Sequence, residues 1–322
     1  MNKTVFLTGG TGRVGIRVLR LLLERGYRVH ALIHRRKPEG VSHKNLRLIQ
    51  GDLLDQDGLK GAVKDSHIIC HLAATFDMFP PVTFERENNP LFENLIRGTY
   101  NLLEAARSLD DLGLFLFTST DAVYATGPIK YDTITEETEL SPCPGRFYAL
   151  AKAVGESLCI NYGKCYGLPW IIIRINWALT SEELLKVFDY EFWEEDIVPE
   201  ERKALGPKLA KGKGVLAPLF SNGEPAVDQI ADPDDTAKGI LLAIDKHESA
   251  KNNVFNIAAP AAFRYVDFVE KVADGLGVSW GTGKVSGYEP YEISNEKAKR
   301  MLGYNPEHTM EEMIERALKQ SR

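Results

Sequence analysis

The feature that most constrains the fold is a glycine cluster that follows the first apolar run of the chain. Residues 5–8 have the pattern of a buried strand, Gly9-Gly10-Thr11-Gly12-Arg13-Val14-Gly15 follows at once, and residues 14–25 have a helical pattern. Only glycine permits such a tight turn and a close backbone approach to a pyrophosphate, which then lies at the positive N-terminus of the helix. The succession of strand, glycine turn and helix therefore predicts a dinucleotide-binding βαβ unit rather than an ordinary surface turn.

Strand-like apolar runs alternate with longer helical patterns along the rest of the chain. Strands are expected at residues 28–33, 46–49, 68–73, 114–119, 170–175 and 254–257, and helices at residues 91–108, 147–162, 234–245, 265–276 and 310–319. This alternation is typical of a parallel sheet covered by helices on both faces. We therefore expect an α/β fold, a doubly wound parallel sheet of the Rossmann type, with a smaller carboxy-terminal substrate lobe.

The alternation breaks after Asn176, which suggests where the lobes divide. Residues 1–175 are expected to form the nucleotide-binding domain, with residues 226–257 returning to it, and residues 176–225 and 258–322 to form the substrate lobe. An acidic, aromatic segment at 188–196 and a Lys/Gly-rich stretch at 208–214 are expected to form an insertion or lid. The aromatic residues at 76–79 and 188–193 either supply apolar walls to the pocket or anchor two long loops to the body.

The composition of the chain indicates which classes of binding partner are expected. The chain has 322 residues, with 39 basic and 45 acidic side chains and a formal net charge of −6, so its overall charge favours neither nucleic acid nor an anionic membrane. It lacks the ~18 uninterrupted apolar residues that would span a bilayer. Its four cysteines form no CxxC pair and its histidines are scattered, which fits neither a disulfide framework nor a metal site. We expect a cytoplasmic protein with a small-molecule substrate and no metal, nucleic-acid or membrane partner.

The end of the second expected strand bears on which dinucleotide is bound. An NAD-selective site usually has an acidic residue there, about twenty residues beyond the glycines, to hold the ribose 2′-hydroxyl. Here the sequence is His34-Arg35-Arg36-Lys37. Arg35 and Arg36, joined by Arg13, would clasp the 2′-phosphate of NADP through charge-assisted hydrogen bonds. The stretch predicts that NADP(H) is preferred and NAD(H) is possible, unless it is only a solvated basic loop.

The rest of the expected cofactor site comes from short polar and small residues at strand ends. After the third strand, Asp52 is placed to accept a hydrogen bond from the adenine amino group, and Leu53 follows it. After the fourth strand, Ala73 and Ala74 are small enough to let the cofactor lie against the backbone. With them we group the residues of the glycine turn, Gly9, Gly12, Arg13, Val14 and Gly15, although the glycines can be spaced as Gly9-x-x-Gly12-x-x-Gly15 or as Gly10-x-Gly12-x-x-Gly15.

Tyr148 and Lys152 are candidates for the chemistry. Their four-residue spacing places the phenol and the ammonium on the same face of a helix. A nearby ammonium favours phenolate and is expected to lower the pKa of Tyr148 toward neutrality, which a proton-transfer catalyst needs. This spacing is common by chance, so its meaning depends on the accompanying motifs.

Together the motifs resemble the extended short-chain dehydrogenase/reductases, also called the NAD-dependent epimerase/dehydratase family. This resemblance selects the Gly9-x-x-Gly12-x-x-Gly15 spacing. The similar segments occur in order along nearly the whole chain: Thr8-Gly9-Gly10-Thr11-Gly12-x-x-Gly15, Asp52-Leu53, Ala73-Ala74, Asn94-x-x-x-Gly98-Thr99, Ser119-Thr120-x-x-Val123-Tyr124, Tyr148-x-x-x-Lys152, Arg174, Asp234-Asp235-Thr236-Ala237, Phe255-Asn256-Ile257 and Lys299-Arg300-Met301-Leu302-Gly303-Tyr304.

The resemblance implies a role for each catalytic candidate. Tyr148 would be the general acid or base at a substrate carbonyl or hydroxyl, and Lys152 would hold the nicotinamide ribose. Thr120 would bond the same substrate oxygen, with Ser119 as its substitute, and Asn94 would support the proton relay unless it is an ordinary helix-surface amide. The nicotinamide supplies the hydride, and the protein supplies position and proton transfer. Residues expected to contact the substrate are Thr75, Thr120, Asp121 and Asn176.

Departures from the family pattern concern the substrate. Members that bind nucleotide sugars usually have Asn-x-Tyr-Gly-Pro after the sixth strand, where this chain has Asn176-Trp177-Ala178-Leu179-Thr180. They usually also carry an arginine that pairs with the diphosphate, and Asp228 stands at about that place. A carboxylate there would repel a diphosphate. These departures favour an NAD(P)-dependent oxidoreductase acting on a small alcohol, ketone or sugar.

Two other functions stay open, as does the oligomeric state. One is a sugar or nucleotide-sugar epimerase or dehydratase with tightly bound NAD. The other is a nucleotide-responsive, non-catalytic regulator, although such a sensor would need the glycines and not Tyr148 and Lys152. The resemblance also implies a homodimer packed through the helices at about residues 92–108 and 147–162, unless their apolar residues only face the sheet.

Overall fold

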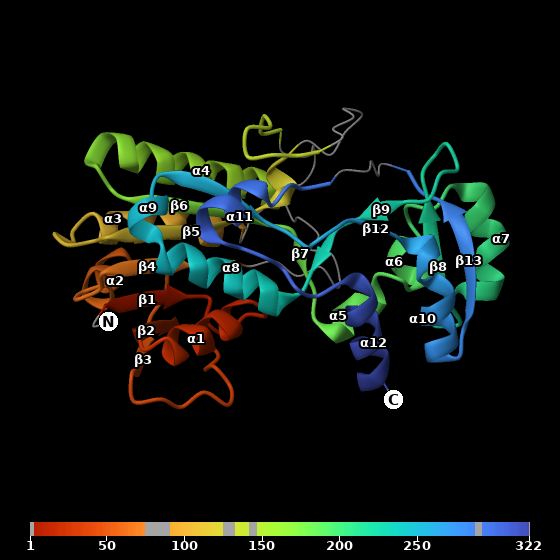
Figure 1. Cartoon of the computed structure of the whole chain (residues 1–322), viewed down its shortest axis with the longest axis horizontal. Helices are drawn as coiled ribbons and strands as arrows, with labels where there is room; N and C mark the ends of the chain where they lie inside the picture. The colour runs from red at the N-terminus through yellow and green to blue at the C-terminus, as the bar shows by residue number, and fades with distance from the viewer. Residues whose placement is uncertain (1–2, 75–90, 125–132, 142–146, 287–291, 322) are drawn as a thin grey trace.

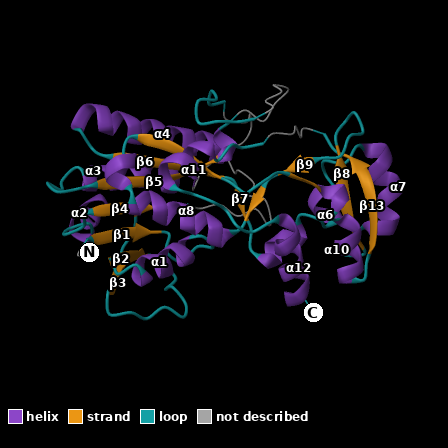
Figure 2. Ribbon diagram, viewed as in Figure 1, coloured by secondary structure: helices purple, strands orange, loops and turns teal. Residues whose placement is uncertain are grey.

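The strands of the first half of the chain form one parallel sheet, which a late strand completes. The computed structural model describes residues 3–74, 91–124, 133–141, 147–286 and 292–321. The strands of the sheet are β1 (Thr4–Thr8), β2 (Arg28–Ile33), β3 (Leu46–Gln50), β4 (Ile68–His71), β5 (Leu114–Thr120), β6 (Trp170–Ile175) and β11 (Asn253–Ile257). Their order is β11-β6-β5-β4-β1-β2-β3 and every neighbouring pair is parallel. Figures 1 and 2 label the strands from β6 to β3. The expected doubly wound α/β fold is confirmed.

Helices cover both faces of the sheet, because successive side chains of a strand point to opposite sides. Phe6, Phe115 and Phe117 pack in one core with α2 (Gln56–Ala62), α3 (Gly98–Ala106) and α4 (Phe147–Tyr166). Val5 and Leu7 pack on the other face with α1 (Gly15–Glu24), α8 (Pro233–Asp245) and α11 (Glu296–Leu302). Because β2 and β4 flank β1, the strand order reverses at β1, and this opens a crevice at the carboxyl ends of β1 and β4.

A second lobe has a core of its own. Its helices are α5 (Ser181–Lys186), α6 (Tyr190–Trp193), α7 (Pro199–Leu209), α10 (Val269–Leu276) and α12 (Met310–Gln320). Its strands form three pairs: β8 (Gly214–Leu219) with β13 (Ser279–Lys284), β7 (Trp177–Ala178) with β10 (Ile230–Ala231), and β9 (Val227–Asp228) with β12 (Phe263–Arg264). Shorter elements are η1 (Phe92–Arg97), η2 (Asp121–Val123), η3 (Tyr265–Asp267) and α9 (His247–Ala250). In Figure 1 this lobe lies beyond β7, beside the sheet domain. No helix in the described part of the chain is long and apolar enough to cross a membrane.

The aromatic segment at 188–193 belongs to the core of this lobe. Phe188 and Tyr190 are fully buried, and Trp193 is nearly so. The rings of Phe188 and Trp193 contact the Tyr265 ring, with centroids 5.2 and 5.6 Å apart. Burying these large apolar rings stabilises the lobe. The segment therefore fits the expected insertion whose aromatic residues anchor it to the body, and the alternative expectation of a lid is wrong.

Two further segments differ from the sequence-based expectation. Residues 296–304, assigned to the substrate lobe, pack instead on the sheet domain, where Ala298, Leu302 and Tyr304 join the core with α8 and β11. The helix expected over residues 91–108 is divided into the π-helix η1 and the α-helix α3. The chain therefore crosses between the two lobes more often than the predicted boundaries imply.

Three acidic residues at the start of α8 bond to neighbouring helices, two of them toward α12 of the second lobe. Asp232 caps α8 by accepting a hydrogen bond from the backbone of residue 234, and it pairs with Arg316 of α12. Asp234 pairs with Arg17 of α1 at 2.7 Å. Asp235 accepts hydrogen bonds at 2.9 and 2.8 Å from two backbone N–H groups just before α12. The Asp-Asp motif therefore fixes α1, α8 and α12 relative to one another.

Candidate active site

The glycine turn between β1 and α1 has a shape that only glycine allows. Gly9 has a φ of +74°, and a Cβ built on it would lie 2.6 Å from the backbone nitrogen of Ala73. A Cβ on Gly15 would lie 2.0 Å from the Gly9 carbonyl oxygen. At Gly10, by contrast, the nearest atom is the flexible end of Leu7 at 3.1 Å. The geometry supports the Gly9, Gly12, Gly15 spacing, with Gly12 exposed at the tip.

The turn fits a dinucleotide diphosphate. Its backbone rests against Ala73 at the end of β4, which the side chain of Thr8 also holds through a hydrogen bond from the Ala73 N–H to Oγ1 at 3.2 Å. Gly12 and the start of α1, where Val14 is the N-cap residue, form the end of the helix that favours a negative charge. The small residue Ala73 therefore lies against the turn.

Arg13 does not join the basic residues at the end of β2. Arg35 and Arg36 are exposed just after that strand. The Arg13 guanidinium instead pairs through Nη2 with Glu183 Oε1 at 2.8 Å and donates through Nη1 to the Ala178 carbonyl oxygen at 3.2 Å. These partners lie on α5 and β7 of the second lobe, and those elements follow β6, on the opposite side of β1 from β2. The expected cluster of three arginines is therefore not formed.

The expected adenine residues lie at the end of β3. Asp52 Oδ1 accepts a hydrogen bond from the Leu54 N–H at 2.9 Å, and Oδ2 lies 3.4 Å from His34 Nε2. The Leu53 carbonyl accepts from the Asn101 amide on α3 at 2.9 Å, which ties this end of the sheet to the helix layer.

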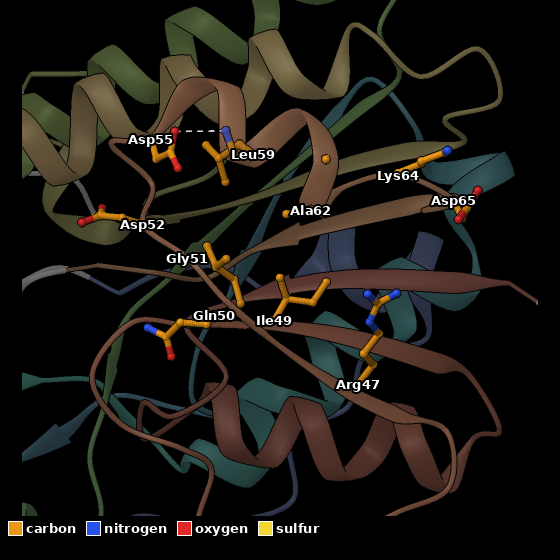
Figure 3. Close-up of a pocket in the computed structure, with 13 residues that line it drawn as sticks. Arg47, Ile49, Gln50, Gly51, Asp52, Asp55, Leu59, Ala62, Lys64 and Asp65 are labelled. Atoms are coloured by element: carbon orange, nitrogen blue, oxygen red, sulfur yellow. Dashed lines mark hydrogen bonds between the residues drawn. The ribbon is translucent and has the colours of Figure 1, made fainter.

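A cavity of about 310 Å³ runs along β3 beneath α2, with Asp52 at one end and Arg47 and Lys64 toward the other (Figure 3). Neither Tyr148 nor Lys152 lines it, so this cavity lies outside the catalytic site.

Tyr148, Thr120 and Lys152 are brought together as predicted. The Tyr148 and Thr120 hydroxyls share a hydrogen bond. Lys152 Nζ lies 5.9 Å from the centre of the Tyr148 ring and donates to the Thr118 carbonyl at 2.7 Å. The α4 helix supplies the tyrosine and the lysine and β5 supplies the threonine, so packing of α4 on the sheet sets their spacing.

The pKa values of this pair differ from the expectation. Burial raises the pKa of the Tyr148 phenol, the carboxylate of Asp121 adds to the rise, and the Thr120 hydrogen bond and the Arg13 guanidinium oppose it. Burial also lowers the pKa of Lys152 to about 8, against a rise caused by Glu156. The prediction that Lys152 brings the Tyr148 pKa toward neutrality is therefore wrong for this structure, because removal from water disfavours both charged forms.

Two of the predicted site residues carry a buried polar atom without a hydrogen-bond partner. Among the described residues, Ser119 Oγ and Asn176 Oδ1 are buried and accept or donate no hydrogen bond. The Asn176 amide is oriented, since its Nδ2 donates to the Gln229 carbonyl. Thr120 donates to Asp121 Oδ1 at 3.0 Å, and the fourth predicted substrate residue, Thr75, falls outside the described residues, as does the aromatic loop at 76–79. Buried polar atoms normally have partners, so a hydroxylated ligand would complete this site.

Asn94 lies in the π-helical turn η1, which packs beside Tyr148. Leu91 and Leu95 of this segment contact Ala151 and the Tyr148 side chain. The Thr99 hydroxyl donates to the Leu95 carbonyl at 2.6 Å, within the region where the helical hydrogen-bond pattern changes. Single π-helical turns are frequent at functional sites, and this one places the Asn94 backbone next to the catalytic helix.

A buried histidine was missed by the sequence analysis. His71 at the end of β4 bonds Thr8 Oγ1 through Nδ1 at 2.7 Å and Thr99 Oγ1 through Nε2 at 3.1 Å. Burial and the charge of Lys152 lower its pKa to about 3, so the ring is neutral. Polar residues at the ends of two adjacent strands, Thr8 and His71, were the available signal.

A buried ion pair behind the site was also missed. Arg174 of β6 makes a two-pronged contact with Glu156 of α4, with Nε to Oε1 at 3.0 Å and Nη2 to Oε2 at 2.7 Å. Glu156 stands one helical turn after Lys152, a spacing that the sequence displays. Within the described ranges, His, Cys, Asp and Glu side chains do not gather in groups of three or more that would hold a metal ion.

Comparison with known proteins adds to this geometry. The family model of the NAD dependent epimerase/dehydratase family matches residues 5–187. The low-salt glycan biosynthesis protein Agl12 of Haloferax volcanii is 25% identical over 326 residues, covering 97% of this chain and 96% of that protein. An L-arabinose 1-dehydrogenase (NAD(P)(+)) of the same organism is 32% identical over 196 residues, covering 58% of this chain and 72% of that protein.

A solved structure extends the likeness to the whole fold. A short-chain dehydrogenase/reductase superfamily protein from Agrobacterium tumefaciens, crystallised with bound NAD, has a TM-score of 0.84 to this structure at 25% sequence identity. The alignment covers 99% of this chain and 97% of that one. Since the family match itself spans more than half of the sequence, the chain belongs to the NAD dependent epimerase/dehydratase family and is an enzyme of the extended short-chain dehydrogenase/reductase type.

Proposed function

We propose that this protein is an oxidoreductase that transfers a hydride between a nicotinamide cofactor and a small alcohol, ketone or free sugar. The observation that carries the proposal is the hydrogen-bonded pair of Tyr148 and Thr120, with Lys152 beside it, at the carboxyl edge of a sheet whose first strand ends in the glycine turn. Thr120 ends β5 and the glycine turn follows β1, so both stand at the carboxyl edge of the sheet, where ligands of doubly wound folds bind.

Tyr148 and Thr120 would act on the same substrate oxygen. Thr120 positions the oxygen, and the Tyr148 hydroxyl gives it a proton during reduction or removes one during oxidation. Lys152 would turn from the Thr118 carbonyl to hold the nicotinamide ribose and offset the burial of a phenolate. The bound nicotinamide supplies or accepts the hydride. Asn94, on the adjoining π-helical turn, would keep the proton relay in contact with solvent.

Several groups favour a hydroxylated substrate without a nucleotide. The buried and unpartnered Ser119 Oγ and Asn176 Oδ1 would offer a hydroxyl and an amide oxygen to it. Asp228 is held by the Tyr265 hydroxyl at 3.0 Å and by the Gln229 N–H at 2.7 Å, so a carboxylate is fixed where a diphosphate-pairing arginine would otherwise stand. The relative that acts on L-arabinose supports a free sugar. An epimerase or dehydratase that retains its NAD is the second candidate, which the family name favours.

The proposal includes a preference for NADP(H), with NAD(H) also accepted. Arg35 and Arg36 are exposed where the 2′-phosphate would lie, and the segment contains no acidic residue. The Agrobacterium tumefaciens structure with bound NAD supports binding of a nicotinamide dinucleotide. It does not distinguish NAD from NADP, which carries the additional 2′-phosphate.

The proposal also includes a cytoplasmic homodimer. The outer faces of η1 and α4 present Phe92 and Leu150, each 47% exposed, which a second copy would cover. Cys70 and Cys159 are free thiols in the core, as suits a reducing compartment.

The decisive experiment compares the wild type with Tyr148→Phe in a screen of sugars, alcohols and ketones with NAD and NADP. We expect turnover to fall by about 10²- to 10⁴-fold, since one acid or base contributes that much, with cofactor affinity retained. Turnover within a few-fold of the wild type would show that Tyr148 is not the acid or base. Stoichiometric cofactor that survives dialysis of the purified protein would favour the epimerase or dehydratase.

A further inference from the structure

The position of Arg13 suggests a role different from the one that its sequence neighbourhood predicts. Its side chain leaves the glycine turn toward the second lobe, where Glu183 and the Ala178 carbonyl hold it. Its own carbonyl accepts from Arg17 Nη1 at 2.7 Å, and Arg17 is in turn paired with Asp234. Both the backbone and the guanidinium of Arg13 are therefore fixed before any ligand binds.

Glu183 is itself held in place by the first turn of α5. The Thr180 N–H and hydroxyl donate to Glu183 Oε2 at 3.0 and 2.9 Å, and the backbone of Glu183 bonds back to the Thr180 hydroxyl. The other carboxylate oxygen is the one that pairs with Arg13. The capping box of α5 therefore fixes the carboxylate that positions the Arg13 guanidinium. This capping box belongs to the second lobe, which is the lobe expected to bind the substrate.

Arg13 follows Gly12 in the glycine turn, so its guanidinium starts from the segment on which a dinucleotide diphosphate would rest. Its charge is close enough to Tyr148 to act on the phenol. A dinucleotide bound on the turn with its nicotinamide at Tyr148 would bring its diphosphate close to this side chain. Guanidinium has five N–H donors, and the contacts with Glu183 and Ala178 use two of the nitrogens while leaving further N–H groups to bond phosphate oxygens.

We propose that Arg13 is the side chain that binds the cofactor diphosphate, serving NAD and NADP alike, and that Glu183 is the positioning residue that holds it there from the substrate lobe. This inference rests on the proposed function, because it presumes that a dinucleotide binds the glycine turn. Under this proposal, Arg35 and Arg36 recognise the 2′-phosphate of NADP without Arg13. It also makes the ion pair a direct connection between cofactor binding and the position of the substrate lobe.

The first test measures dissociation constants of NAD and NADP by isothermal titration calorimetry, without substrate. A charged hydrogen bond to phosphate contributes about 10- to 100-fold in affinity, so Arg13→Gln is expected to weaken both cofactors by the same factor within that range. The comparison variant Arg35→Ala is expected to weaken NADP only. A loss confined to NADP in Arg13→Gln, or no loss, would overturn the inference. Wild-type protein that bound neither dinucleotide would instead refute the proposed function.

The second test concerns Glu183. Glu183→Gln is expected to weaken both cofactors by about three- to tenfold, and to add nothing in the Arg13→Gln background, because the carboxylate acts through the arginine. Glu182→Gln makes the same change of charge one residue earlier, at a side chain 86% exposed and paired with Lys186, and should leave both affinities unchanged.

Thr180→Ala separates positioning from stability of α5. It removes the capping hydroxyl and leaves Glu183 bonded to the backbone N–H of residue 180, so cofactor affinity should stay within about threefold of the wild type. An equal loss in Thr180→Ala and Glu183→Gln would mean that Glu183 acts only through the helix. Tighter cofactor binding by Glu183→Gln would mean that the carboxylate competes with the diphosphate, and either result would overturn the role of Glu183.

Discussion

Replacing Lys152 with methionine should stabilise the ligand-free protein while abolishing its activity. Lys152 is 3% exposed, and burial lowers its pKa from 10.5 to about 8. Because a tenfold change in a protonation constant corresponds to about 1.4 kcal/mol, holding the ammonium in this environment costs about 3 kcal/mol at neutral pH. Methionine fills most of the same volume without a charge. Allowing for the lost hydrogen bond to Thr118, we expect Lys152→Met to raise the free energy of unfolding by about 1–3 kcal/mol at pH 7.

The difference in stability should depend on pH in a defined direction. Below pH 8 the lysine is protonated in both the folded and the unfolded chain, so the cost of its burial is fully present. Between pH 8 and 10.5 the unfolded chain binds the proton and the folded one does not, so wild-type stability rises with pH relative to the variant. Above pH 10.5 the lysine is neutral in both states. The advantage of Lys152→Met should therefore shrink across this window.

Urea unfolding of cofactor-free protein at pH 7, 8.5 and 10 measures the effect. Lys319→Met, at an exposed position of α12, is the matched control and should change the free energy of unfolding by no more than about 0.5 kcal/mol. If Lys152→Met were less stable than the wild type at pH 7, or if its advantage did not change with pH, the inference that burial of the Lys152 ammonium destabilises the fold would be refuted.

Two further predictions concern the ion pair and the dimer. Arg174→Met leaves the Glu156 carboxylate buried without its partner and should lower the free energy of unfolding, measured with a chemical denaturant, by about 3–5 kcal/mol. The double variant Arg174→Met, Glu156→Leu should recover most of this loss. A double variant as unstable as the single one would refute ionic coupling. Leu150→Glu, at the exposed face of α4, should convert a dimer to a monomer in sedimentation velocity with little change in melting temperature, and a wild type that sediments as a monomer would refute the dimer.

The strands, the cofactor turn and the catalytic pair could be predicted from the sequence because each depends on nearby residues. Continuous apolar runs define the parallel strands, since both faces of the sheet are covered. Gly9 and Gly15 define the turn, since any Cβ there would collide with the backbone within the turn or at the end of β4. The four-residue step from Tyr148 to Lys152 is a property of one helix. These features are local, and the structure confirms their geometry.

Tertiary structure decided what depends on residues far apart in the chain. The sequence alone placed Arg13 with Arg35, but the direction of its side chain was set by Glu183, 170 positions later and brought near by the second lobe. The aromatic segment at 188–193 had the composition of a lid, yet Tyr265 and its neighbours supplied an apolar core to bury it. The pKa of Tyr148 depended on how completely the fold excludes water. A linear pattern records which groups are present, whereas charge pairing and desolvation arise only when distant segments pack together.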